Sequence, residues 1–159
     1  MSLRRSRPGA NTRSVGQALA EFALVAPIFF VLLFAIIEGG RFMIYYETLN
    51  NATREGARYA IVNGGNTLGC PSGPPAPNST PCDVSGNNVK ARVRSAAFGV
   101  LGTGVTVTPQ WLKADGTPGD NGRGMTVTVE ADYSYHSLVP LVPLPAFTIT
   151  AESTLVINN

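Results

Sequence analysis

The chain has 159 residues, of which 44% are hydrophobic and only 14% are charged, a low share of charge for a soluble domain. Four arginines among the first 16 residues, which contain no acid, produce the net charge of +2; residues 17–159 carry eight basic and ten acidic side chains, a net of −2. The length allows one modest domain, or a small domain with an anchor. The main part of the chain lacks the basic excess of nucleic-acid-binding proteins, so we expect no nucleic-acid partner.

The first predicted element is an apolar helix from Ala18 to Ile37. Twenty residues at ~1.5 Å per residue span ~30 Å, the thickness of a bilayer core, and no other segment is apolar enough to surround this helix in a soluble core. A cleaved secretory signal would have a shorter apolar core that ends in a small-x-small site, so a retained anchor is favoured. The preceding arginines predict a cytoplasmic N-terminus, with the chain after about residue 38 outside.

Glu21 is the charged residue within this apolar helix, and a carboxylate in hydrocarbon is costly. Two interpretations remain open: the side chain reaches back to the membrane interface without a further role, or it pairs with a cation such as a neighbouring subunit's terminal amine. Pro27 interrupts the same helix and favours a kink. That kink either gives local flexibility or is passive.

The residues around Glu21 resemble the processing site of type IV prepilins. A basic leader precedes the run Gly16-Gln17-Ala18-Leu19-Ala20-Glu21-Phe22, and Glu21-Phe22 is similar to the Flp/Tad branch. This resemblance implies that a prepilin peptidase cuts between Gly16 and Gln17, and that Glu21 helps to set subunit register. The leader departs from most relatives, which have Arg directly before the glycine where this chain has Ser14-Val15.

A longer stretch resembles the TadE-like family of the tight-adherence (Tad) system. The matching features are Ala20 to Leu24, Pro27, Glu38, Gly40, Arg41, and the run Arg54-Glu55-Gly56-Ala57-Arg58-Tyr59-Ala60. The resemblance implies a minor pseudopilin of the bacterial inner membrane, with prepilin peptidase, other pilins or pseudopilins, the Tad assembly machinery and the lipid bilayer as partners. It divides the chain into a leader, residues 1–16, a transmembrane helix, 17–38, and an extracytoplasmic domain, 39–159.

The charges that cleavage would create also favour an assembly role. Cleavage would leave an amine at Gln17, and pairing that amine with Glu21 of a neighbour would offset much of the cost of desolvating the carboxylate. The rival interpretation is a signal-anchored extracytoplasmic binding or adhesion domain that never enters a filament.

Glu38 to about Asn63 is predicted to continue the helix beyond the membrane. Apolar residues recur there at spacings of three and four, which is typical of one helical face. We expect this stripe to pack on the sheet of the same domain rather than on a partner helix. It consists of Phe42, Tyr45, Leu49, Ala52, Gly56 and Tyr59.

Residues 64–86 form a predicted loop rich in Gly, Pro, Asn and Ser, and contain both cysteines, Cys70 and Cys82. An even number of cysteines closing a short loop indicates a disulfide formed in an oxidising compartment; two free thiols are the alternative. A loop of this length is uncommon inside a compact domain and is often functional or mobile.

A second helix is predicted from Asn88 to Leu101. Its basic residues, Lys90, Arg92 and Arg94, lie off the apolar face and are interpreted as a solvated face, with a lipid-headgroup or partner contact as the alternative. The apolar face is assigned to Val89, Val93, Ala96 or Ala97, and Val100.

Three strands complete the predicted α+β fold: Val105 to Gln110, Gly124 to His136 and Phe147 to Ile157. The second strand alternates apolar and polar residues, which predicts one buried and one solvated face. The apolar side of this alternation consists of Met125, Val127, Val129, Ala131, Tyr133 and Tyr135. Lys113 to Arg123 is predicted to be a hairpin loop, and Val139 to Pro145, with three prolines, an extended crossover. The expected architecture is therefore a long, partly transmembrane helix packed on a small three-stranded antiparallel sheet, with one additional helix, as in pilins.

No catalytic or metal-binding constellation is predicted. His136 is the only histidine, and a metal site needs further histidine or thiolate ligands. The glycines from Gly116 to Gly124 lack the Gly-Lys-Ser/Thr of a phosphate-binding loop. We therefore expect neither enzymatic activity nor a cofactor.

Overall fold

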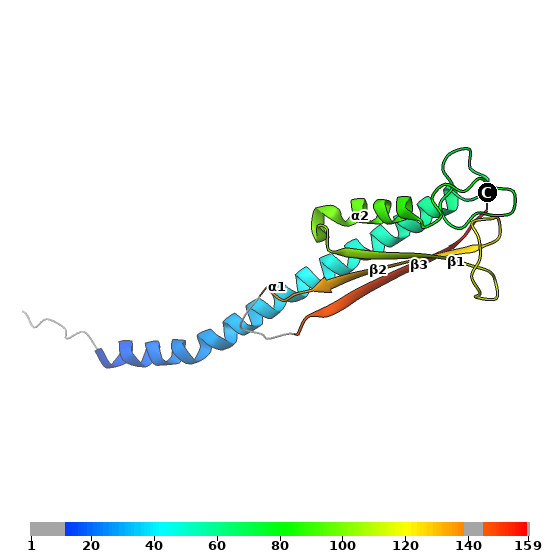
Figure 1. The fold of residues 1–159 in the computed structure, drawn as a ribbon. Coiled ribbons are helices and arrows are strands. Elements are labelled where there is room, and N and C mark those ends of the chain that lie inside the picture. The colour runs from blue at the N-terminus through cyan, green and yellow to red at the C-terminus, as the bar shows by residue number, and fades with distance from the viewer. Residues whose placement is uncertain (1–11, 139–144, 159) are drawn as a thin grey trace, which may run out of the picture.

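The structure, a computed structural model, describes residues 12–138 and 145–158. Helix α1, Thr12–Val62, is 51 residues long. Its first half projects away from the rest of the chain, while its second half lies with α2 on one face of the sheet (Figure 1). The predicted continuation of the apolar helix beyond Ile37 is thus confirmed.

The described residues after the apolar run form a domain, named the outer domain because it lies at the end of α1 away from Thr12. It contains the second half of α1, one further helix and three strands. Helix α2 spans Asn87–Leu101, and the strands are β1, Val105–Leu112, β2, Thr126–Tyr135, and β3, Phe147–Val156. The strands lie in the order β1-β2-β3, and both neighbouring pairs are antiparallel. Helix α1 packs against β2, β3 and α2, and α2 also contacts β1. The predicted α+β fold is confirmed, with element boundaries that differ by a few residues.

The outer half of α1 packs through the predicted stripe. Leu49, Ala52 and Gly56 are buried, and Phe42 and Tyr45 pack against the core from its edge. Helix α2 approaches so closely at Gly56 that a Cβ added there would lie 2.3 Å from Val93 Cγ2. The glycine is therefore required by the contact between the two helices.

The buried face of α2 differs from the predicted face at one position. Val89, Val93, Ala97 and Leu101 are buried, whereas Val100 is 43% exposed, so the assignment of Val100 was wrong. The buried residues recur every four positions and form a ridge inclined to the helix axis, as expected when a helix crosses a neighbouring surface at an angle. The prediction assumed a face parallel to the helix axis, which includes Val100. The observed ridge is inclined to the axis and therefore ends on Leu101.

The sheet has one covered face and one open face, as the alternation predicted. Val127, Val129 and Ala131 are buried under the helices. On the open face, Asp132 accepts a hydrogen bond from Thr150 Oγ1 at 2.6 Å. Most of the predicted crossover, residues 139–144, lies outside the described residues.

The loop of residues 64–86 lies at the distal end of the domain and is closed on itself by the predicted disulfide. Cys70 and Cys82 are bonded, with a Cα–Cα distance of 5.3 Å. Asp83 Oδ1 and Oδ2 accept hydrogen bonds, each of 2.7 Å, from the first backbone N–H groups of α2 at Asn87 and Asn88. Because these groups have no partner within the helix, the loop also caps α2.

Trp111 of β1 and Asn121 of the loop between β1 and β2 complete this distal end. Gly73 has φ of +102°, and a Cβ there would lie 2.3 Å from the Trp111 ring, so both the backbone and the space require glycine. Asn121 is 1% exposed. Its side chain accepts from Ala76 N at 2.9 Å and donates to the Ser72 carbonyl at 3.3 Å. The loop is therefore an ordered part of the domain.

Candidate functional site

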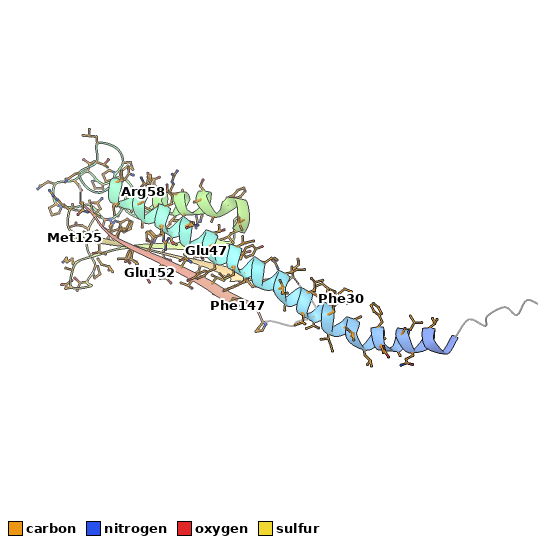
Figure 2. The ribbon with its side chains drawn as sticks, turned by 180° about the vertical axis from the view of Figure 1, so that it is seen from behind. Phe30, Glu47, Arg58, Met125, Phe147 and Glu152 are labelled. Carbon is orange, nitrogen blue, oxygen red and sulfur yellow. A yellow bond between two sulfur atoms is a disulfide. The ribbon has the colours of Figure 1, made fainter. Side chains whose placement is uncertain are left out.

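The first half of α1 is an apolar helix without a partner in the described part of the chain. It is long and apolar enough to cross a membrane, and none of its most apolar window is buried. Leu19, Phe22 and Leu24 are each more than 60% exposed, and Phe30 projects from the helix well away from the sheet (Figure 2). A helix that is apolar on all sides requires lipid or other helices around it, so this half fits a single-pass membrane anchor.

The predicted processing and register residues lie together near the start of this helix. A Cβ added at Gly16 would meet no atom within 4 Å, so the site is open on all sides. Gln17 Nε2 donates to Glu21 Oε1 at 3.1 Å, and both residues are exposed. Within one chain, the carboxylate of Glu21 therefore contacts a neutral amide and remains accessible to a cation. Phe22 is exposed on the adjoining surface, and α1 stays helical through Pro27.

A cluster of polar groups around Glu38 forms where the anchor meets the domain. Tyr135 Oη donates to Glu38 Oε1 at 2.6 Å, and Leu138 N donates to the same oxygen at 3.3 Å. Arg41 Nη1 lies 3.1 Å from Glu38 Oε2. Glu38 is only 8% exposed, and a buried carboxylate is tolerated when it is paired and hydrogen-bonded. The cluster fastens the membrane-proximal end of β2 to α1.

Aromatic rings complete this Glu38 cluster. The Arg41 guanidinium lies 5.4 Å from the ring centroid of Tyr45 and 5.6 Å from that of Tyr135, within the range of cation–π attraction. The pKa of Tyr135 is raised to about 12, mainly by burial and secondly by the hydrogen bond to Glu38. The hydrogen bond from Arg41 Nη2 to Tyr45 Oη raises the pKa of Arg41 further above its usual value. Both groups therefore hold their protons throughout the physiological range.

After its apolar run, α1 carries two of the motifs noted in the sequence: the first is Glu38, Gly40 and Arg41, and the second is the run from Arg54 to Ala60. The second motif is divided between two faces of the helix. Gly56 and Ala57 are buried against α2 and the sheet, whereas Arg54 and Arg58 are exposed. Between them, Glu55 accepts a hydrogen bond from Arg92 Nε of α2 at 3.0 Å, and this contact lowers the pKa of Glu55. The small residues thus serve packing, and Arg54 and Arg58 are left for solvent or a partner. Gly40, in the first motif, is exposed and open.

Two polar residues that organise the domain were not singled out from the sequence. Tyr135 was predicted to face the core, and a buried phenol requires a hydrogen-bond partner. That partner, Glu38, lies 97 residues away in the sequence, and no local pattern connects the two residues. Asn121 lies in the Gly-rich loop, where asparagine is ordinary. Its burial depends on the packing of two distant loops and has no local signal.

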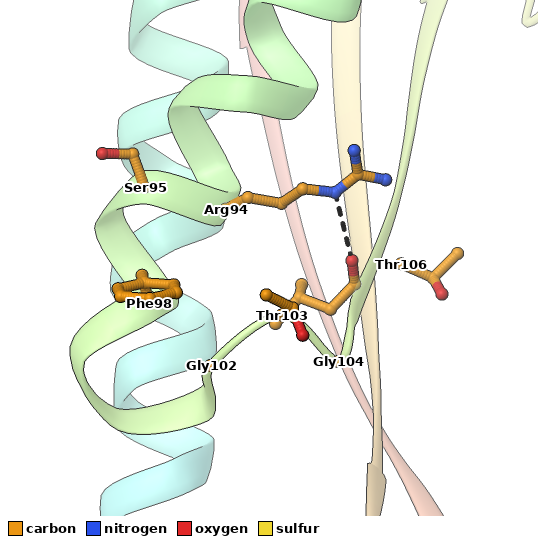
Figure 3. A pocket seen from close by; sticks show the side chains of 8 residues that line it. Arg94, Ser95, Phe98, Gly102, Thr103, Gly104 and Thr106 are labelled. Carbon is orange, nitrogen blue, oxygen red and sulfur yellow. Dashed lines mark hydrogen bonds between the residues drawn. The ribbon is translucent and has the colours of Figure 1, made fainter.

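A hollow of about 720 Å³ lies between the end of α2 and the start of β1 (Figure 3). Arg94 reaches across it and donates from Nε to the Val105 carbonyl at 3.3 Å. Phe98, on the next turn of α2, is 62% exposed at its border. Lys90, Arg92 and Arg94 were predicted to form a solvated basic face. Two of them make contacts within the domain instead, since Arg92 pairs with Glu55 and Arg94 ties α2 to β1.

The described residues contain no group of three His, Cys, Asp or Glu side chains that could hold a metal ion. His136 is exposed near the end of β2. The expectation that the chain has no cofactor and no enzymatic activity stays a prediction.

Comparison with known proteins gives one match. Residues 16–58 match the family model described as TadE-like protein, and this family is a pilus component rather than an enzyme family. No curated protein and no solved structure matches the chain. The matched segment begins at the predicted processing site and ends within the second motif of α1. It contains the apolar run and the α1 side of the Glu38 cluster, Glu38 and Arg41, but not Tyr135 or Leu138. Over these residues the chain is similar to the TadE-like family, the resemblance that its sequence indicated.

Proposed function

We propose that the chain is a minor pseudopilin that takes part in assembly of a Tad/Flp-type pilus. A prepilin peptidase removes residues 1–16, and the mature chain remains in the inner membrane with its C-terminal domain outside the cytoplasm. The observation that supports this most is the arrangement of residues 16–22 at the start of a bare apolar helix. There, an open glycine, an exposed glutamate and an exposed phenylalanine lie within two turns.

Glu21 has the accessibility that a register residue needs. Its contact with Gln17 in the same chain uses a side-chain amide, which leaves the amine formed by cleavage to be paired. An amine of one subunit and the Glu21 carboxylate of the next would attract strongly where water is excluded. A helix displaced along its neighbour would leave both charges unpaired in a low dielectric, which is costly.

The processing step is tested by mass spectrometry of the protein extracted from membranes, with and without the prepilin peptidase. We expect a mature start at Gln17 that depends on the peptidase. Gly16→Leu is expected to block processing without affecting the fold, since no atom lies near a side chain at this position. Gly39→Leu, at another open glycine of α1, is the matched control. An intact leader in the native host would favour the anchored binding domain instead.

The register role is tested by incorporation of the processed protein into the pilus machinery. Glu21→Gln keeps the size and hydrogen-bonding capacity of the side chain but removes its charge, and we expect incorporation to fail. Glu47→Gln makes the same change at an exposed site of the outer half of α1 and is expected to have little effect. Normal incorporation of the Glu21 variant would refute the pairing.

A further inference from the structure

A second hollow, of about 560 Å³, opens at the membrane-proximal end of the domain, between α1 and the end of β2. We call it the headgroup pocket. It shares Arg41 and Leu138 with the Glu38 cluster. Its polar side chains Ser134 and His136 belong to no feature described above. The described residues that line it are Arg41, Leu101, Thr103, Gly104, Tyr133, Ser134, His136, Ser137 and Leu138.

The anchor fixes the height of this pocket above the membrane. Leu138 N donates to Glu38 Oε1 at 3.3 Å, which places the lower edge of the pocket level with Glu38. Arg41 follows the last residue of the apolar run, Ile37, by four positions, a rise of ~6 Å along the helix. The polar headgroup layer outside the hydrocarbon core is about 5–7 Å thick. When α1 spans a bilayer, Arg41 therefore lies at the depth of the lipid phosphates.

The lining of the pocket suits a phosphodiester. Arg41 uses two of its nitrogens, Nη1 and Nη2, in the contacts with Glu38 and Tyr45, and a guanidinium has further N–H donors beyond these. His136 and Ser134, both exposed, add polar groups that can donate hydrogen bonds. No carboxylate is among the described residues of the lining. Charge-assisted hydrogen bonds from such groups are the strong contacts of phosphate sites.

Two exposed apolar side chains lie at this end of the domain, and one of them, Leu138, lines the pocket. Leu138 is 71% exposed, and Phe147, at the start of the neighbouring strand, is 40% exposed although its ring contacts Phe42 and Tyr135. In water these side chains leave apolar surface uncovered. At the depth set by Glu38 they meet the boundary between headgroups and hydrocarbon, so lipid covers them.

We propose that the membrane-proximal end of the domain docks on the outer surface of the bilayer, with the phosphodiester of one phospholipid in the headgroup pocket and Leu138 at the edge of the hydrocarbon. The lipid contact that the sequence left open for Lys90, Arg92 and Arg94 thus belongs to Arg41 and the end of β2. This inference requires the membrane anchor but not entry into a filament, so it stands or falls separately from the pseudopilin role.

Docking is tested on the full-length chain in lipid nanodiscs that contain phospholipid spin-labelled at the headgroup. A tryptophan introduced as Leu138→Trp is expected to be quenched severalfold more strongly than one introduced as Leu68→Trp. Leu68 is a fully exposed leucine in the distal loop, and the buried Trp111 at the distal end is common to both variants. Equal quenching at the two positions would overturn the proposal.

The pocket itself is tested by adding a carboxylate. In the Leu138→Trp protein, His136→Glu is expected to lower the ratio of docked to undocked domains by about tenfold or more, because it places a like charge beside the lipid phosphate. Thr128→Glu adds the same charge on the open face of the sheet and is expected to leave quenching unchanged. An equal effect of both variants would show that overall charge, and not the pocket, controls docking, and would overturn the assignment.

A final arm distinguishes lipid from a soluble phosphate. Glycerol phosphate is added to the same nanodiscs, and the signals of His136 are followed by NMR together with lipid quenching of the Trp at position 138. We expect quenching to persist at millimolar glycerol phosphate, because the anchored domain meets lipid at a far higher effective concentration. Binding of glycerol phosphate at His136 without lipid quenching would identify a small-anion site and refute the proposal.

Discussion

Gly56 lies where α1 and α2 approach too closely for a single added methyl group. In Gly56→Ala the new Cβ would lie 2.3 Å from Val93 Cγ2 and 3.5 Å from Val129 Cγ1. Valine is stiff about χ1, so the overlap must be relieved by a shift of the helices. Overpacking of this kind costs about 1–3 kcal/mol, whereas replacing a helical glycine with alanine contributes about 1 kcal/mol of stability. We expect a net loss of about 1 kcal/mol.

The assay is denaturant unfolding of the full-length protein in detergent micelles, followed by near-UV circular dichroism. Gly99→Ala is the matched control, because Gly99 lies in α2 with no atom within 4 Å of an added Cβ, and it should stabilise the protein by about 1 kcal/mol. In a Val93→Ala background the overlap is removed, so Gly56→Ala should become neutral or stabilising. Equal stabilisation by the Gly56 and Gly99 substitutions in the wild-type background would refute the reasoning.

Three further predictions concern the Glu38 cluster and the distal loop. In the folded protein the pKa of Tyr135 is raised to about 12, whereas the pKa of tyrosine in the unfolded chain is near 10. The stabilisation from Tyr135 is therefore complete below about pH 10 and is lost as the pH rises toward 12. Ultraviolet titration should show one tyrosine that ionises at unusually high pH, and Tyr135→Phe should remove this transition. Replacing Cys70 and Cys82 with serine should cost about 2–3 kcal/mol of unfolding free energy, measured by denaturant titration, since the bridge closes a short loop. Asp83→Ala should cost about 1–2 kcal/mol in the same assay, because two backbone N–H groups of α2 lose their acceptor; Asp83→Asn should lose less. An unchanged midpoint for any of these variants would contradict the corresponding contact.

Periodicity predicted most of the architecture, because the pattern of burial along a helix or strand is a local property of the chain. The alternation in β2 identified Val127, Val129 and Ala131 as buried, and the spacing in α1 identified Leu49 and Ala52. The same reasoning assigns a residue to a face but does not name what covers that face. The error at Val100 has this origin, since the tilt of α2 against its neighbours decides which residue of the last turn is buried.

The contacts of the candidate site are only partly open to prediction from the sequence, for the same reason. Glu38 and Arg41 are three residues apart on one helix, so their pairing is accessible to sequence reasoning. The partner that completes their environment, Tyr135, comes from the far end of the chain. The disulfide was predictable because two cysteines allow only one pairing. The burial of Asn121 was not, since it depends on how two irregular loops meet.

The absence of a break in α1 between Thr12 and Val62 has a mechanical consequence. A helix advances by ~1.5 Å and turns by ~100° per residue, and the Glu38 cluster ties α1 to the end of β2 where the anchor enters the domain. If the anchor slips by one residue along a neighbouring helix while keeping equivalent contacts, it must also turn like a screw, and the whole domain swings through the same angle. A small axial error inside the membrane is thereby converted into a large change in the surface that the domain presents outside it.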